Sequence, residues 1–414
     1  MCGMEVKSSI ARIFESVLRR QPLFRNKDAL RHTYTPEELP HREEEISSLA
    51  TILAPALKGE TPSNVLIYGK SGTGKTIVSK FVCMELREMS RRYGSPVSMV
   101  YLNCEVTDTQ YRVLANLANS FGGEVPFTGW PTDKVYSAFK KAVEERGHNV
   151  IIILDEIDRL VSKGGDRVLY SLTRINSELV NARVSIVGIS NNLKFTDYLD
   201  TRVQSSLSGE EIVFKPYNAK QLEDILRQRA ELAFEPGVLD DYVIPLCAAL
   251  AAREHGDARR ALDLLRVSGE VAERENAEVI TEKHVRKASE KIEKDNVVEA
   301  VRSMPTHSKI LLYAVILLEE NMTKFITTGK IYQTYRYLCR EVAVDPLTQR
   351  RISDLLSELD MLGILNSTVI SKGRYGRTRE IKLAVPLGDI KRVVEEDPRL
   401  SRLSSASLRQ KTLD

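Results

Sequence analysis

One glycine-rich run constrains this chain more than any other feature. It fits the pattern G-x-x-x-x-G-K-[ST] and consists of Gly69, Lys70, Ser71, Gly72, Thr73, Gly74, Lys75 and Thr76. The apolar run 64–68 precedes it and is typical of a buried strand, and apolar residues at helical spacing follow it. Glycines let backbone N–H groups point at phosphate oxygens, and a helix N-terminus adds partial positive charge. The run therefore predicts a nucleotide phosphate loop.

Further polar groups are expected to complete this site, with ATP or ADP and Mg²⁺ as its ligands. Lys75 would reach the β- and γ-phosphates, and the Thr76 hydroxyl would hold Mg²⁺. The apolar run 150–154 delivers two carboxylates at its carboxyl end. Asp155 would join the Mg²⁺ shell, and Glu156 would orient or deprotonate the attacking water. An ordinary strand-to-loop transition is the alternative, but the position downstream of a phosphate loop favours the catalytic interpretation.

Strand-like and helix-like stretches alternate through the first half of the chain. The strand candidates are 65–68, 99–103, 150–154, 184–190 and 211–214. This alternation predicts an α/β fold with a largely parallel sheet covered by helices, and ligands collect at the carboxyl ends of such strands. Asn191 and Asn192 follow the fourth candidate, where an amide can position the same water. An ordinary turn is the alternative for this pair.

Helical patterns dominate residues 216–295. Asn218 and Gln221 form a sequence typical of a capping box at the first of these helices. Arg259 lies near a helix start, from which it could swing onto a neighbouring phosphate, although a solvated arginine is equally common. At the other end of the chain, the pattern of 7–20 predicts an amphipathic helix, and packing is favoured over a separate DNA-binding arm.

The basic residues concentrate near the C-terminus. From Asn296 onward there are 19 Lys and Arg against 14 Asp and Glu, a net charge of +5, so the first 295 residues carry −2. Helices are expected at 308–320 and 329–341, followed by a helix that Thr348 caps. The first turns of that last helix carry Gln349, Arg350, Arg351 and Ser353. This arrangement is typical of a recognition helix, whose N-terminal half contacts base edges in the major groove.

Two β-like runs follow, 364–370 and 378–385, and the basic segment 371–377 joins them. Three helices and such a hairpin predict a winged helix. Its candidate DNA-binding residues are Lys372, Arg374, Tyr375, Arg377 and Arg379. We expect contacts with backbone phosphates or the minor groove, rather than a hairpin that is merely solvated.

Composition excludes several classes of protein. No apolar run approaches the ~20 residues of a membrane span, so no membrane partner is expected, and the first residues lack a signal-peptide pattern. The five cysteines, at positions 2, 83, 104, 247 and 339, form no close pair, which argues against a zinc site and a disulfide framework. This cysteine usage fits a reducing cytoplasm. The DNA binding expected of the winged helix would associate the protein with the nucleoid there.

With these pieces in place, the chain resembles the archaeal origin-recognition and cell-division-control initiators, which are AAA+ ATPases with a C-terminal winged helix. The resemblance runs from Leu39 to the wing, and its most specific stretches are 111–115, 125–129, 174–178 and 251–259. It implies an AAA+ base domain at 1–215 with an N-terminal helix and an initiator-specific insertion at about 108–130. A helical lid would occupy 216–295 and the winged-helix domain 296–400, followed by a flexible tail at 401–414.

The resemblance also implies roles for single residues. Asn191 resembles the sensor-one residue, Arg259 the sensor-two arginine of the lid, and Arg202 an arginine finger that acts on a neighbouring subunit's nucleotide. Thr201 and Gln204 depart from the family, in which Pro and Lys are common at these positions. The residues expected around the adenine are Pro40, His41, Arg42 and Tyr217. At the insertion tip, Phe127 and Thr128 would touch DNA, with a packed hydrophobic loop as the alternative.

The function that the resemblance implies is ATP-dependent initiation of DNA replication. Such a protein binds duplex origin DNA, recruits or loads the replicative minichromosome-maintenance helicase, and uses slow ATP hydrolysis as a conformational switch. Paralogous initiators or further copies of itself on DNA are additional partners. An ATP-tuned DNA-binding regulator or repressor is one alternative. A clamp-loader-type subunit is a weaker one, because clamp loaders end in a helical collar rather than a winged helix.

Overall fold

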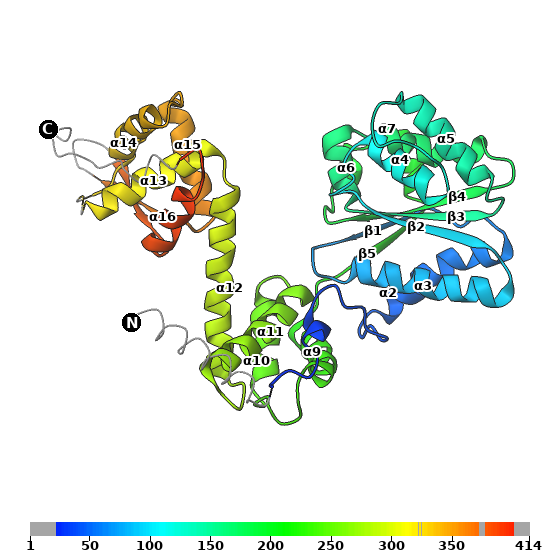
Figure 1. The fold of residues 1–414 in the computed structure, drawn as a ribbon, viewed down its shortest axis with the longest axis horizontal. Helices are drawn as coiled ribbons and strands as arrows, with labels where there is room; N and C mark the ends of the chain where they lie inside the picture. The colour runs from blue at the N-terminus through cyan, green and yellow to red at the C-terminus, as the bar shows by residue number, and fades with distance from the viewer. Residues whose placement is uncertain (1–21, 322, 324, 372–376, 401–414) are drawn as a thin grey trace, which may run out of the picture. The chain divides into compact units, whose positions relative to one another are not determined.

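The computed structural model describes residues 22–321, 323, 325–371 and 377–400. The expected helix at 7–20, the wing residues 372–376 and the tail 401–414 lie outside these ranges. The chain divides into two compact units, one ending at Arg286 and the other beginning at Lys287, which Figure 1 colours from blue to red along the sequence. Within the described ranges, no helix combines the length and the hydropathy needed to cross a membrane.

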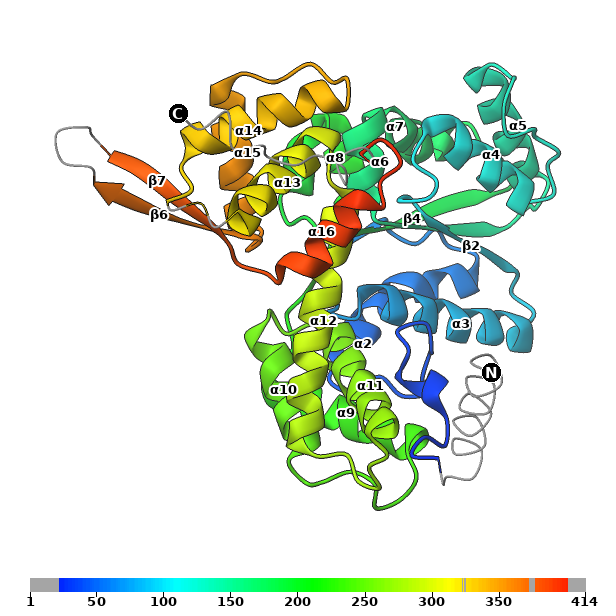
Figure 2. The same cartoon turned by 60° about the vertical axis from the view of Figure 1, so that its left-hand side comes forward.

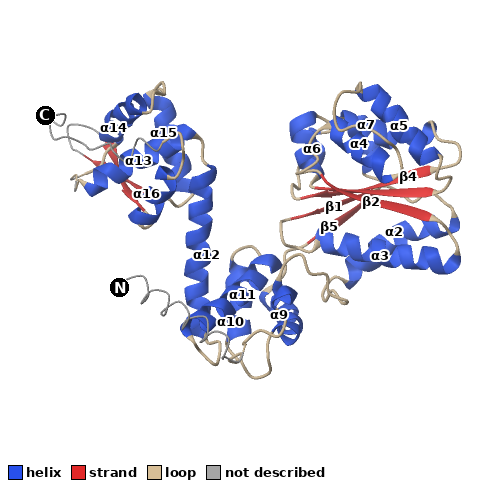
Figure 3. Ribbon diagram, in the orientation of Figure 1, coloured by secondary structure: helices blue, strands red, loops and turns tan. Residues whose placement is uncertain are grey.

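The first unit is built on a five-stranded sheet with the order β2-β3-β4-β1-β5. All four neighbouring pairs are parallel, which confirms the prediction of a parallel sheet. Figure 3 shows the strands in red between helices on both sides. The strands are β1 (Val65–Gly69), β2 (Val97–Asn103), β3 (Asn149–Asp155), β4 (Arg183–Ser190) and β5 (Glu210–Phe214).

Helices cover both faces of this sheet. One face carries α2 (Glu43–Leu53) and α3 (Lys75–Tyr93), and the opposite face carries α4 (Gln110–Ser120), α5 (Thr132–Glu144), α6 (Ile157–Gly164) and α7 (Arg167–Arg174) (Figures 1 and 3). The described residues of this part also form α8 (Thr201–Leu207) and the 3₁₀ turns Lys27–Leu30, Ala54–Lys58, Ile175–Ser177 and Phe195–Tyr198.

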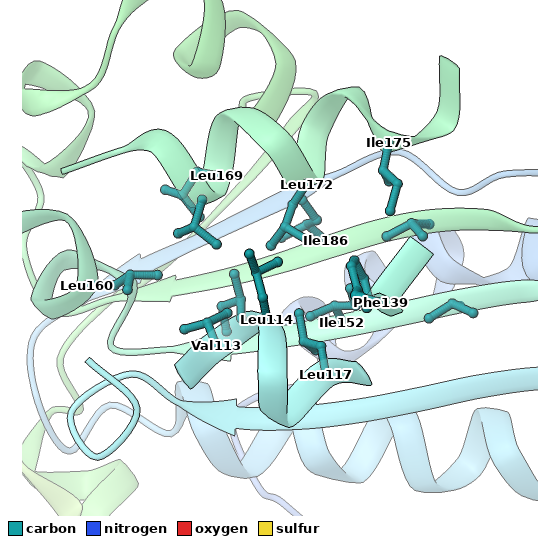
Figure 4. Packing of buried hydrophobic residues seen from close by; sticks show 14 of the residues in the cluster. Val113, Leu114, Leu117, Phe139, Ile152, Leu160, Leu169, Leu172, Ile175 and Ile186 are labelled. Atoms are coloured by element: carbon teal, nitrogen blue, oxygen red, sulfur yellow. The ribbon is translucent and has the colours of Figure 1, made fainter. Parts of the chain in front are cut away.

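Strand β3 shows how the apolar residues of the sequence specify this architecture. Its residues are buried on both faces: Ile152 and Leu154 pack beneath α4 to α7, whereas Ile151 and Ile153 pack against α2 and α3. A strand buried on both faces has a continuous apolar run instead of alternation. Figure 4 shows the larger of the two cores, where Leu114 and other side chains of the covering helices meet Ile152.

A helical group follows the sheet. It contains α9 (Ala219–Ala233), α10 (Val243–Arg253) and α11 (Ala258–Glu275), and α9 begins with the capping box that Asn218 and Gln221 predict. The segment that precedes α2 folds back onto this group. Phe24 stacks on Phe234 with ring centroids 4.7 Å apart, and both rings lie against Gly269, where a Cβ would come within 2.4 Å of Phe24.

The described residues of the second unit form helices and one hairpin. Its elements are α13 (Thr306–Glu320), α14 (Thr328–Glu341), α15 (Gln349–Met361), β6 (Leu365–Ser371), β7 (Arg377–Leu383) and α16 (Leu387–Glu395). Strands β6 and β7 are antiparallel and extend beside the helices (Figure 2), and Thr327 adds a bridge to Glu380. Helix α13 is the centre of this core, because every residue from Ser308 to Leu318 is buried.

Helix α12 (Glu282–Ser303) continues past residue 295, where the helical segment expected from the sequence ends. It continues for two more turns because Val297, Val298 and Val301 pack on the apolar core of the second unit. The first half of α12 is highly charged, so the sequence alone predicts that the helix ends early. The later valines gain their packing partners only in the folded unit.

The fold makes a test of the larger core possible. Leu114 is completely buried in α4, so Leu114→Ala should lower the free energy of unfolding of the first unit by about 2–5 kcal/mol. Urea unfolding followed by the fluorescence of Trp130, the chain's single tryptophan, measures this change. Val180→Ala is the matched control: Val180 is 77% exposed, so its effect should stay within about 0.5 kcal/mol. Equal effects of the two substitutions would contradict this description of the core.

Candidate functional site

The glycine-rich run forms the connection between β1 and α3. Gly69 ends β1 against β5, and a Cβ there would lie 2.6 Å from the Phe214 carbonyl oxygen, so only glycine fits. Gly74 has φ 93° and precedes α3, whose first turn receives no side-chain cap. The N–H groups of that turn therefore have no side-chain acceptor of their own. A helix N-terminus of this kind is a binding site for anions such as phosphate.

Lys75 is buried at the start of α3. Its Nζ donates hydrogen bonds of 2.7 Å to the carbonyl oxygens of Gly69 and Lys70. Burial lowers the pKa of Lys75 to about 8, although the nearby carboxylate of Asp155 acts in the opposite direction. A bound polyphosphate would supply the negative charge that favours the ammonium form and would raise this pKa again.

The Asp155 carboxylate contacts Thr76, the last residue of the phosphate loop. Its Oδ2 accepts 2.7 Å hydrogen bonds from the Thr76 Oγ1 and from the Tyr101 hydroxyl. The described residues contain no cluster of three His, Cys, Asp or Glu that would hold a metal ion unaided. This donor set suits Mg²⁺, which binds to one or two carboxylates together with substrate phosphates. Thr76 and Asp155 would hold that ion.

Glu156 immediately precedes α6 and has a left-handed backbone conformation, with φ 57°. Such a conformation is uncommon for a residue other than glycine and is concentrated at functional sites. Burial raises the pKa of Glu156, and the carboxylates of Glu105, Asp155 and Asp158 add to the rise. A carboxylate with a raised pKa is suited to accept a proton.

Asp158 ties the end of β3 to the end of β4. Its Oδ1 accepts hydrogen bonds from the Ser190 Oγ at 2.9 Å and from the Asn191 backbone N–H at 3.4 Å. This contact holds Asn191 at the same edge of the sheet as Glu156, and both residues line one pocket. The sequence pattern pointed to Asn191 but did not reveal the role of Asp158.

The pocket has a volume of about 310 Å³ and three walls. The first comes from the phosphate loop and strand ends: Gly72 to Ile77, Lys80, Asp155, Glu156 and Asn191. The second comes from the helical group: Ile225, Gln228, Arg229, Ala258, Arg259 and Leu262. The third is His32, Thr33, Thr35, Pro36, Glu38, Leu39 and Pro40, with Tyr217 beside it. Sequence reasoning missed Arg229 and residues 32–39, because no local motif marks them.

The helical group contacts the phosphate loop directly. The Ala258 N–H at the start of α11 donates to the Gly72 carbonyl oxygen at 3.1 Å. Asp257 caps the same helix, accepting from the Arg259 N–H at 2.7 Å, and its carboxylate lies against Gly72. Gly72 has φ 72°, and any Cβ there would collide with Asp257. This contact brings Arg259 to the pocket, where its charge lies near Lys75.

The four residues expected around the adenine divide into two pairs. Pro40 and Tyr217 line the pocket. Arg42 lies behind it: its guanidinium donates to the Thr73 carbonyl, the Tyr217 hydroxyl, the Lys215 carbonyl and Glu45, and it covers the Tyr217 ring at 3.9 Å. His41 pairs with Asp224 of α9 at 2.9 Å. Arg42 and His41 thus hold the walls together instead of lining the pocket.

Arg202 lies elsewhere in the first unit. It is exposed on α8, its Nε is 3.4 Å from the Asp200 Oδ1, and it does not line the nucleotide pocket. Arg202 lines a separate open hollow of about 510 Å³, together with Asp133, Asp166 and Tyr170.

The recognition-helix candidate is α15. Thr348 caps it, accepting from the Arg351 N–H, and Gln349, Arg350 and Arg351 are exposed on its first turn. Ser353 is half-buried and donates to the Gln349 carbonyl at 3.1 Å.

On the hairpin side, Arg379 of β7 is exposed, and its Nη1 donates to the Ser357 Oγ of α15 at 3.0 Å. Lys372, Arg374 and Tyr375 lie outside the described residues, and only the backbone of Arg377 is described. For these four residues the DNA-binding prediction therefore stays a prediction.

The expected insertion forms α4 and the loop that follows it. The Asn119 side chain makes two hydrogen bonds with the Val125 backbone, at 2.8 and 2.9 Å, and the Tyr111 hydroxyl donates to the Pro126 carbonyl at 2.7 Å. These bonds anchor the loop while its tip stays in solvent: Phe127 is 62% exposed, and Thr128 is exposed beside it.

The chain matches three family models in succession. Residues 58–194 match an AAA domain, residues 223–290 a Cdc6 AAA+ ATPase-type lid domain, and residues 299–393 the C-terminal winged helix domain of CDC6. Among solved structures, it is similar to the Aeropyrum pernix ORC1 protein in complex with DNA. That match has a TM-score of 0.80 and 48% sequence identity, and it covers 93% of this chain and 100% of the other.

Curated relatives agree with these matches. The chain is 59% identical to the ORC1-type DNA replication protein of Thermococcus onnurineus, over 97% of this chain and 98% of the relative. It is 62% identical to ORC1-type DNA replication protein 1 of Archaeoglobus fulgidus, over 94% and 95%. The predicted family and the predicted combination of AAA+ domain, helical lid and winged helix are confirmed. This chain belongs to the family of ORC1-type DNA replication proteins, which have an AAA+ ATPase fold and a Cdc6-type winged helix.

Proposed function

We propose that this protein is an ATP-dependent initiator of DNA replication, which binds duplex origin DNA and recruits or loads the replicative minichromosome-maintenance helicase. Family membership and the Aeropyrum pernix ORC1 structure with DNA support this function. The observation that carries it is the pocket in which the phosphate loop, Glu156 and Arg259 of the lid meet. The protein would act in the cytoplasm on the chromosome, with paralogous initiators or further copies of itself.

In this proposal each polar residue of the pocket has one task. The N–H groups at the start of α3 and the Lys75 ammonium bind the phosphates, and Thr76 with Asp155 holds Mg²⁺, which neutralises phosphate charge. Glu156 accepts a proton from the attacking water, and the Asn191 amide orients that water. Arg259 pairs with a phosphate oxygen.

The lid makes the nucleotide a conformational switch. Because Asp257 and Ala258 already touch Gly72, a phosphate on the loop would be contacted by α3 and α11 together, so ATP and ADP would favour different lid positions. Turnover in an isolated chain would be slow, because Arg202 lies outside its own pocket and would act on a neighbour's nucleotide. Arginine fingers of this type contribute roughly 10³–10⁵ in rate.

A regulator or repressor that binds the same DNA would use the same residues, so recruitment of the helicase distinguishes it from an initiator. The first experiment is a fluorescence-anisotropy titration of an origin duplex and of a scrambled duplex, each with ATP and with ADP. Preference for the origin duplex supports the proposal, and the bound complex is then tested for retention of the helicase. Equal affinity for both duplexes under every condition would contradict origin recognition.

Substitutions on the two DNA-facing elements should separate base reading from phosphate binding. Arg350→Ala or Arg351→Ala should reduce discrimination between the two duplexes by about 1–3 kcal/mol if the side chain makes a bidentate base contact. Arg379→Ala should weaken binding to both duplexes equally and make that binding less dependent on salt concentration. Arg392→Ala, an exposed arginine of α16 that is bonded to Glu396, is the control and should change neither. Equal losses on both duplexes for all three test variants would remove α15 from its role.

Glu156→Gln should bind ATP as tightly as the unaltered protein and fail to cleave it, because the amide cannot accept the proton from water. Binding and phosphate release are measured separately at saturating ATP. Glu105→Gln removes a neighbouring exposed carboxylate that also raises the pKa of Glu156, and it should leave hydrolysis within a few-fold of normal. Normal hydrolysis by Glu156→Gln would show that another group activates the water.

Tyr101→Phe should weaken binding of ADP in the presence of Mg²⁺ by about 10-fold, because Asp155 loses a hydrogen bond worth about 1.5 kcal/mol. Affinity in the presence of a chelator should stay unchanged, since the hydroxyl contacts the carboxylate and not the phosphate loop. Titration calorimetry with and without Mg²⁺ gives both values. Tyr93→Phe, at the exposed end of α3, is the control. An equal loss in both conditions would indicate that Tyr101 supports the fold alone.

A further inference from the structure

Arg229 of α9 is a buried arginine with an unsatisfied donor. It is 3% exposed, and its Nη1 has no hydrogen-bond partner anywhere in the described part of the chain. A guanidinium carries five N–H donors and does not lose its proton in proteins. Leaving a charged donor unpaired in the interior costs free energy, so a group in this state calls for an explanation.

The rest of the guanidinium holds the segment before α2. Its Nη2 donates to the backbone carbonyls of Tyr34 at 3.2 Å and Arg31 at 3.5 Å, and its carbon lies 4.5 Å from the Tyr34 ring centroid. Among the described residues, Arg229 makes no ion pair with a carboxylate. Burial lowers the pKa of Arg229, in agreement with a charge that has only carbonyls and a ring as neighbours.

Arg229 also lines the nucleotide pocket. Ile225, Gln228 and Arg229 are spaced i, i+3 and i+4, so one face of α9 forms this part of the wall. The phosphate groups belong at the other wall, with Lys75 and the start of α3. The remainder of a nucleotide must therefore extend toward α9 and residues 32–40, where apolar side chains such as Leu39 and Ile225 suit the faces of a base.

We propose that Arg229 reads the nucleotide base, by donating a hydrogen bond from Nη1 to a ring nitrogen of adenine. This inference rests on the proposed nucleotide binding and names a residue for base recognition. The bound base would accept the hydrogen bond from the buried Nη1. The Nη2 of the same guanidinium donates to the Tyr34 carbonyl, so a shift of the guanidinium toward the base would also move that carbonyl's hydrogen-bond donor. Base recognition and the position of the segment before α2 are thereby coupled through one side chain.

The test is a double-mutant cycle between protein and ligand. ADP and its 1-deaza, 3-deaza and 7-deaza analogues, each lacking one ring nitrogen, are titrated into the full chain and into Arg229→Met by calorimetry. The unaltered protein should bind one analogue about 10- to 150-fold more weakly than ADP, the range expected for a hydrogen bond from a charged group. Arg229→Met should bind ADP more weakly by a similar factor and should not distinguish that analogue from ADP.

Two controls separate base reading from structural support. Arg227→Met removes an exposed arginine of the same helix, which is paired with Glu223, and should retain the preference of the unaltered protein. Arg229→Lys keeps the positive charge and is used if Arg229→Met fails to fold, which Trp130 fluorescence reports. Arg229→Lys should also fail to distinguish ADP from that analogue.

Two results would overturn the inference. One is an equal weakening of ADP and all three analogues by Arg229→Met, which would assign Arg229 to holding residues 31–34 in place. The other is a variant that discriminates among the analogues as the unaltered protein does. Failure of the unaltered protein to bind ADP at all is a different result, because it would overturn the nucleotide site itself.

Discussion

Burial of the parallel sheet on both faces is the constraint on which the rest of this structure depends. Because β3 has apolar partners above and below, its backbone cannot shift without breaking two cores. Parallel strands also present all their carboxyl ends at one edge. The phosphate loop after β1, the carboxylates after β3 and the amide after β4 therefore meet there, although they are far apart in the sequence. The chemistry of the site is a consequence of this packing.

The site also requires contact between two separate layers of the first unit, the phosphate loop on the sheet and the helical lid. Gly72 accepts a hydrogen bond from Ala258 and leaves space for Asp257, while Arg42 joins the phosphate loop to Tyr217 and Lys215 at the start of the lid. These contacts are short and polar, and few of them are exposed to solvent. A ligand that adds charge at the loop would act on both layers at once, which is the physical argument for the nucleotide switch that we propose.

Local patterns predicted most of the elements within a few residues. The glycine run, the apolar strand before Asp155, the capping box at Asn218 and the helix from Gln349 each depend on chemistry among near neighbours, which the sequence displays directly. The helical segment expected to end at residue 295 continues to Ser303 as α12, because Val301 gains its partners only from a core assembled later in the chain. His41 and Arg42 were expected at the adenine, but their donors bond to Asp224, Thr73 and Tyr217.

By itself, the sequence determined where backbone geometry allows a phosphate loop, which strand is buried on both faces and which helix carries exposed arginines near its start. Those properties follow from glycine, apolar periodicity and capping over a few residues. The tertiary structure alone decided that Tyr101 donates to Asp155, that Asp158 joins β3 to β4 and that Arg229 reaches the pocket. Each of these depends on strand order and helix docking, which bring together side chains that no local pattern connects.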